Sequence, residues 1–136
     1  MKKILFPAIA VLLVICTVLG CGWYYNARSD NAQKNTAQQE AAEAYGCFVR
    51  FRETGDEKYY SYAVSSFYRF EQTYCLYDDR YYPTTNTVYA LLVEKPEDCR
   101  AHFDELLDAM EILSGDVTHP NGYGKLAHFM NAVQEG

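Results

Sequence analysis

The fold is decided by residues 54–74, which read TGDEKYYSYAVSSFYRFEQTY. Gly55 can adopt the left-handed conformation that ends a helix, and Asp56 can cap the helix that follows. Glu57 suits the positive N-terminal end of that second helix. Apolar side chains then recur at intervals of three and four residues, at Tyr60, Ala63, Phe67, Phe70 and Tyr74. This period predicts a helix that buries one continuous face.

The residues before this turn predict a partner helix. Its apolar positions follow the same helical spacing, at Ala37, Ala41, Ala44, Tyr45, Phe48 and Phe51. Because the link between the two helices is short, we expect them to form an antiparallel hairpin.

The remainder of the chain also predicts helices. We expect a loop over residues 75–83, and then a short helix capped by Thr84 or Thr85. Pro96 begins a longer helix that ends at Gly115, and a last helix covers residues 120–133. No useful strand-like alternation occurs. The predicted fold is therefore all-α, an N-terminal transmembrane helix followed by a compact bundle of four or five short helices.

The N-terminal segment predicts the membrane helix. Residues 4–25 contain no charged side chain, and a bilayer core needs about 20 such residues. An aromatic belt suited to the membrane interface follows, at Trp23, Tyr24 and Tyr25. By the positive-inside rule, Lys2 and Lys3 predict a cytoplasmic N-terminus and an extracytoplasmic C-terminal domain. We therefore expect a single-pass protein of the cell membrane.

Two other interpretations of this segment stay open. It could be a cleaved secretory signal. The sequence Val18-Leu19-Gly20-Cys21 also resembles a lipobox, which implies a lipoprotein anchored through Cys21. All three interpretations place the domain outside the cytoplasm, and two of them keep it on the membrane.

The expected organisation has three parts. Residues 1–25 are a membrane anchor or signal segment, and residues 26–36 are a polar helical stalk. Residues 37–136 form the extracytoplasmic helical domain. The sequence has 136 residues in all, which allows one such domain.

Composition and motifs argue against several functions. A formal net charge of −6 argues against a nucleic-acid partner, which needs a basic face. No nucleophile, phosphate-loop or dinucleotide motif occurs, so we expect neither an enzyme nor a cofactor. Cys99 and His102 could share a helix face, but a zinc site needs four converging ligands, so we expect no metal. The acidic residues after Asp98 are interpreted as a solvated helix face.

Three cysteines lie in the predicted domain, at positions 47, 75 and 99. An odd number cannot pair completely within one chain. The hairpin keeps Cys47 and Cys75 apart. A bridge from Cys99 to either of them stays open beside the simpler interpretation of three buried thiols.

The chain contains 13 tyrosines, and most of them lie between residues 59 and 89. They cannot all point into one core. Tyrosine and arginine are typical of the centres of protein interfaces. The partner-binding candidates are therefore Tyr62 on the outer side of its helix and, in the expected loop, Arg80, Tyr81 and Tyr82. The alternative is amphipathic packing, in which each ring covers the core and its hydroxyl meets water.

Residues 51–59 are similar to the first hairpin of extracytoplasmic four-helix sensor bundles, the type found in chemoreceptors and sensor kinases. That resemblance implies a second membrane helix and a cytoplasmic signalling domain, which these residues do not include.

Two functions follow as expectations. The first is a membrane-anchored extracytoplasmic helical protein that binds an unknown protein partner, as an accessory of an envelope assembly. The second is a helical bundle that senses a small ligand. The binding protein predicts a filled core and an external aromatic patch, whereas the sensor predicts an internal cavity lined by Tyr and Phe.

Overall fold

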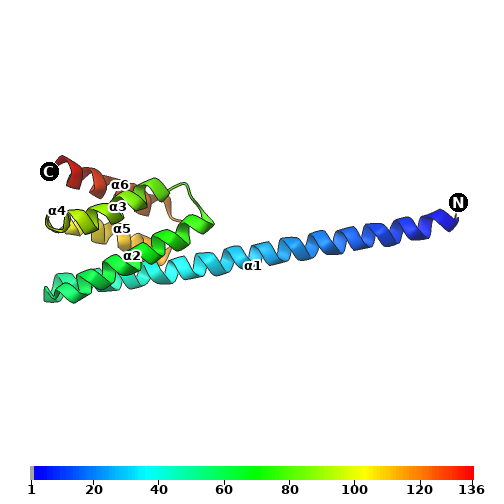
Figure 1. Cartoon of the computed structure of the whole chain (residues 1–136), viewed down its shortest axis with the longest axis horizontal. Helices are drawn as coiled ribbons and strands as arrows, with labels where there is room; N and C mark the ends of the chain where they lie inside the picture. The colour runs from blue at the N-terminus through cyan, green and yellow to red at the C-terminus, as the bar shows by residue number, and fades with distance from the viewer. Residues whose placement is uncertain (1) are drawn as a thin grey trace. The chain divides into compact units, whose positions relative to one another are not determined.

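A computed structural model describes the backbone of residues 2–136 and the side chains of residues 9–136. This part of the chain folds into helices and contains no strand (Figure 1). The helices are α1 (Lys2–Thr54), α2 (Glu57–Tyr77), α3 (Tyr82–Glu94), α4 (Pro96–Ala101), α5 (Phe103–Gly115) and α6 (Pro120–Glu135). The all-α prediction, with a long apolar first helix and a bundle of shorter ones, is confirmed.

The chain divides into two compact units. The first ends at Ala32, and the second covers Gln33–Gly136. From Ile9 onward, α1 is long and apolar enough to cross a membrane by length and composition, and its most apolar stretch buries no side chain. The side chains of Lys2 and Lys3, on which the predicted orientation depends, lie outside the described residues.

The turn between α1 and α2 has the predicted chemistry. Gly55 has a φ of 68°, in the left-handed region that favours glycine. The Asp56 carboxylate accepts a hydrogen bond from the Lys58 backbone N–H at 3.1 Å and so caps α2. Tyr60 of α2 contacts Phe48 of α1. Arg69, which lies later in α2, contacts Glu40, which lies earlier in α1, so the two helices run in opposite directions. The antiparallel hairpin is therefore confirmed.

The core of the second unit joins the predicted α2 stripe to the other helices. Every residue of that stripe is buried. The largest side chains with almost no exposed surface are Tyr74, Tyr123, Phe48, Phe67, Phe70 and Phe129. Ring contacts link Phe48 of α1 to Tyr60 of α2 and Phe103 of α5. One aromatic and aliphatic core thus holds these helices together.

The expected loop over residues 75–83 is wrong, because α2 continues to Tyr77 and α3 begins at Tyr82. Residues 78–81 alone form the link. The Asp78 carboxylate accepts a bond from the Arg80 backbone N–H at 3.1 Å, which makes a tight turn. The predicted cap at Thr84 or Thr85 is also wrong, since both residues lie inside α3.

The single helix expected over residues 96–115 is interrupted at His102. Its backbone N–H bonds to the Cys99 carbonyl, three residues back, rather than to the fourth residue back. Phe103 then begins α5 and places its ring 5.6 Å from that of Phe51. The interruption therefore accompanies aromatic packing of α5 against α1, which the local sequence does not reveal.

Gln38 of α1 joins the start of the second unit to the end of α5 and the turn that follows it. Its side-chain amide donates to the carbonyl oxygens of Leu113 and Ser114 at 2.9 and 2.5 Å. Its carbonyl oxygen accepts the Val117 backbone N–H at 2.8 Å. One side chain thus satisfies backbone groups at the end of α5 that the helix leaves unpaired.

Candidate functional site

The apolar surface of the second unit is gathered on two helices. Large apolar side chains that are exposed after residue 25, within the described part of the chain, lie on α2 and α3 and nowhere else. They are Tyr62, Tyr68, Leu76 and Val93, with exposed fractions between 44% and 71%. We call these four residues the α2–α3 face. By contrast, the exposed residues of α5 include Asp104, Asp108 and Glu111.

The helical period explains how α2 presents this surface. Successive residues turn by about 100°, so Tyr62 and Leu76 each point about 200° away from the buried residues Tyr60 and Tyr74. Tyr68 lies between these two along the helix, and its ring lies 5.0 Å from that of Tyr89 on α3. The tyrosine pair therefore extends the apolar surface from α2 across to α3.

An open depression of about 330 Å³ lies between α2 and α3. Its apolar lining includes Val64, Leu92 and Val93. Tyr60 also lines it, and its hydroxyl donates to the Leu92 carbonyl at 2.8 Å. Burial raises the pKa of Tyr60, so its phenol is neutral at physiological pH. The depression offers apolar surface with little unpaired polarity.

Arg100 of α4 fixes one side of this depression. Its guanidinium group bonds to Glu57 at 2.7 Å and to Glu97 at 2.8 Å. The same group lies 5.1 Å from the ring centroid of Tyr60 and 5.2 Å from that of Phe51. A planar cation over aromatic faces is stabilising, so Arg100 joins α4 to α1 and α2.

The structure brings Arg80 and Tyr81 together, with the guanidinium carbon 5.6 Å from the ring centroid, but it separates Tyr62 from them. Tyr62 is exposed on α2, about 22 Å along the helix axis from the end of α2. Arg80 lies in the link after that end and forms an ion pair with Asp78, which lowers the pKa of the carboxyl group. Tyr82 is the first residue of α3. A role for these residues in partner binding stays a prediction.

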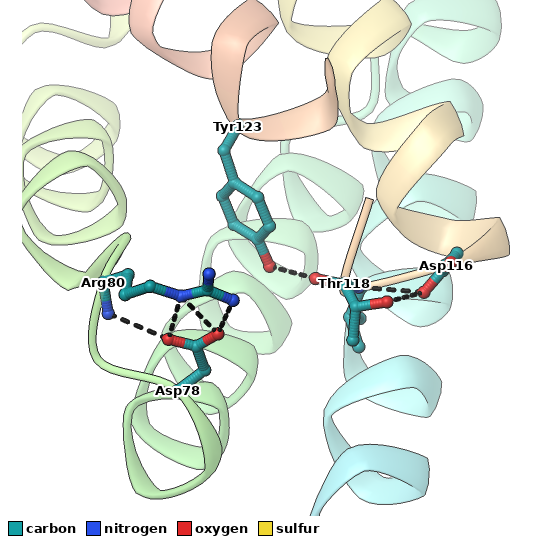
Figure 2. Close-up of polar contacts among 6 residues, drawn as sticks. Asp78, Arg80, Asp116, Thr118 and Tyr123 are labelled. Atoms are coloured by element: carbon teal, nitrogen blue, oxygen red, sulfur yellow. Dashed lines mark hydrogen bonds and ion pairs between the residues drawn. The ribbon is translucent and has the colours of Figure 1, made fainter. Parts of the chain in front are cut away.

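Tyr81 is not a free loop residue, and this part of the sequence expectation is wrong. Its ring stacks on that of Tyr123 at 4.1 Å, with an angle of 4° between the planes. Tyr123 is buried in α6 and donates its hydroxyl to the Val117 carbonyl at 2.5 Å (Figure 2). Tyr81 therefore packs the link between α2 and α3 against the core.

The turn that receives the Tyr123 hydroxyl is itself held by side chains. The Asp116 carboxylate accepts bonds from the Thr118 backbone N–H at 2.9 Å and the Thr118 hydroxyl at 2.6 Å (Figure 2). These bonds stabilise the ionised form and lower the pKa of Asp116. The surroundings of Tyr123 are thus ordered structure with no open site.

Replacing Tyr81 by serine should lower the free energy of unfolding by about 1–2 kcal/mol, because the variant loses a ring pair and the area it buries. Tyr62→Ser is the matched control, since that ring is exposed, and its effect should stay within about 0.5 kcal/mol. Urea denaturation of the full chain in detergent, followed by circular dichroism, measures both. Equal effects of the two variants would contradict the packing role of Tyr81.

The cysteines show no redox or metal arrangement in the described part of the chain. Cys99 is buried, Cys47 and Cys75 are half-buried, and no disulfide joins them. Burial raises the pKa of Cys99 to about 11, so its thiol stays protonated. Cys21, the lipidation candidate, is exposed on α1. No three or more metal-ligating side chains converge among the residues that the structure describes.

Sequence reasoning missed Leu76 and Val93. Leu76 fell inside the expected loop, where a helical direction has no meaning. Extending the period of α2 by one turn would have placed it opposite the buried stripe. Val93 follows two buried leucines, and the sequence alone does not separate it from them.

Comparison with known protein families, curated proteins and solved structures finds no match for this chain. Its functional assignment therefore depends on the geometry of its own residues.

Proposed function

We propose that this chain is a membrane-anchored extracytoplasmic protein that binds another protein through the α2–α3 face, as an accessory of an envelope assembly. One observation carries the proposal: the exposed large apolar side chains of the second unit gather on α2 and α3. Exposed large apolar side chains that gather on two neighbouring helices are costly in water and are typical of binding sites. Tyrosines supply large contact area at a small cost in conformational entropy.

The filled core favours this function over the sensing of a small ligand. The aromatic rings that a sensor would arrange around a cavity are packed against each other, as in the contact of 5.7 Å between Phe67 and Phe70. The depressions found among the described residues open to solvent. Ligand sites usually enclose most of their ligand, so a surface partner fits this domain better.

The first unit supports the membrane part of the proposal. Its apolar side chains are exposed to the surroundings, among them Trp23, Tyr24 and Tyr25. A bilayer would cover the apolar segment, and the aromatic rings suit its interface. Beyond residue 25 the sequence has eighteen acidic and ten basic side chains. Attachment through a lipid on Cys21 is the alternative form of anchoring.

Site-specific crosslinking in membranes tests the binding surface. A photoreactive amino acid in place of Tyr68 should crosslink the full chain to one protein species. The same amino acid in place of Glu111, an exposed residue of α5, is the control and should not. The double variant Tyr62→Ser/Leu76→Ser should remove the product formed from position 68, because it removes two of the four apolar side chains of the α2–α3 face.

The matched control for this double variant is Asp98→Ser/Glu111→Ser, which changes two exposed acidic residues and should leave the product intact. Both double variants should keep their melting temperature, since surface substitutions cost about 0.5 kcal/mol or less. Equal crosslinking from positions 68 and 111, or none from either, would contradict the proposal.

A further inference from the structure

Glu71 is a carboxylic acid enclosed by the bundle. It lies on α2 among the buried residues of the stripe, with 1% of its surface exposed. Neither of its side-chain oxygens makes a hydrogen bond of full geometry among the described residues, although the Tyr82 hydroxyl and the Gln72 amide lie near enough to act on the carboxyl group. Buried carboxylates are ordinarily paired with a cation or with several donors. Glu71 therefore sits where its ionised form is poorly supported.

The cations near Glu71 in the sequence are engaged elsewhere. Arg69 bonds to Glu40 at 2.8 Å and lies 3.6 Å from Glu43, both on α1. Arg80 forms its ion pair with Asp78. A buried hydroxyl is also used, because Thr85 of α3 donates toward the Tyr82 carbonyl at 3.1 Å. No ion pair of Glu71 occurs among the described residues, and none of these groups compensates its charge.

The titratable groups around Glu71 are phenols. Tyr82 approaches from the start of α3, and Tyr74 lies one turn along α2. Tyr123 of α6 packs on Tyr74 at 5.2 Å. Burial raises the pKa of Tyr74 and Tyr123, so these two rings carry no charge at physiological pH.

Burial has the largest influence on the pKa of Glu71. It raises the pKa of Glu71, while the Tyr82 hydroxyl and the Gln72 amide oppose this change by stabilising the carboxylate. Burial outweighs the two polar groups. The sign follows from linkage. A carboxyl whose pKa is higher in the folded chain than in the unfolded chain destabilises the fold as pH rises through the folded value.

We propose that Glu71 is a pH-sensitive latch at the junction of α2 and α3, closed while its side chain is a neutral acid and loosened when that acid ionises. On ionisation the carboxyl O–H bond breaks and the proton passes to solvent water. The carboxylate then needs hydration, which it gains when the start of α3 at Tyr82 and the link over residues 78–81 move away from α2. The proposal requires no partner protein and stands apart from the proposed binding function.

Hydrogen exchange on the full chain in detergent tests the latch. Opening coupled to the loss of one proton should lower the protection factor of the Thr85 amide, which donates to the Tyr81 carbonyl at 3.0 Å, by up to about tenfold per pH unit. Amides at the centre of α6 are the internal control and should not follow this slope. In Glu71→Gln, which cannot ionise, the slope in α3 should disappear. The matched control Glu111→Gln changes an exposed acid and should keep it.

Melting temperatures measured from about pH 4 to about pH 9 provide a second readout. Asp56, Asp78 and Asp116 have lowered pKa values, so they lose stability on acidification and mask the wild-type profile. Subtracting the melting temperature of wild type from that of Glu71→Gln at each pH cancels the effect of these carboxyl groups. This difference in melting temperature should grow in favour of Glu71→Gln as pH rises. A difference that stays constant with pH would overturn the latch.

A direct titration keeps the proposal testable even where Glu71→Gln fails to fold. Carbon-13 NMR of the side-chain carboxyl groups of the wild-type chain reports the ionisation of each acid. Glu71 should titrate at a clearly higher pH than an ordinary glutamate. A midpoint for Glu71 at the ordinary value of about 4.3 would overturn the proposal.

Discussion

Replacing Phe67 by alanine is expected to lower the free energy of unfolding by about 3–5 kcal/mol. The Phe67 ring has no exposed surface and lies 5.7 Å from the ring of Phe70. Removing it loses the transfer energy of the ring and leaves a cavity that the packed helices cannot fully close. A domain of this size is stabilised by about 5–15 kcal/mol in total, so the variant should sit near the limit of folding.

Urea denaturation of the full chain in detergent, followed by circular dichroism, measures this loss. Tyr62→Ala is the matched control, because it removes an aromatic ring from the exposed side of the same helix. The control should lose less than about 1 kcal/mol. If the Phe67→Ala midpoint matched that of the control, the assignment of the α2 stripe to the core would be wrong.

Gly122→Ala should lower the free energy of unfolding by about 1–3 kcal/mol, although alanine is the better helix former. A Cβ atom at position 122 would lie 2.5 Å from Cδ2 and 2.7 Å from Cγ of Leu113. Leu113 has no exposed surface, so it cannot move aside without disturbing the core. The α5–α6 packing would therefore be forced apart.

Gly124 lies two residues along the same helix and gives the opposite expectation. A Cβ atom there meets nothing within 4 Å. Gly124→Ala should therefore stabilise the chain by up to about 1 kcal/mol. Thermal unfolding of the two variants separates them by sign. A stabilising Gly122→Ala would contradict the close approach of α6 to Leu113.

Local chemistry made part of the fold predictable. The α1–α2 turn depends on a left-handed glycine and a capping carboxylate that are adjacent in the sequence, and both form as expected. The α2 stripe is a property of one helix. Other features depend on distant residues. The Tyr81 ring is held by Tyr123, and the different roles of Gly122 and Gly124 depend on Leu113.

The candidate site was predicted only in part, because it too depends on residues that are distant in the sequence. The helical period indicated that Tyr62 faces away from the buried stripe. It did not show which exposed sides of α2 and α3 other helices would cover, and this left Leu76 and Val93 unrecognised. Glu71 was also missed, because a charged residue on a helix is ordinarily exposed and its burial arises from the packing of α2 against α3.

The bonds of Gln38 have a consequence for the order in which the chain folds. This residue is synthesised early, yet its partners lie 75 to 79 positions later. These bonds therefore cannot form until residues 113–117 have emerged from the ribosome. Contacts of such long range are slow to form, and exposed apolar surface invites aggregation meanwhile. Chains that stop before residue 113 lack these partners, so premature termination should yield products that depend on chaperones or proteases for removal.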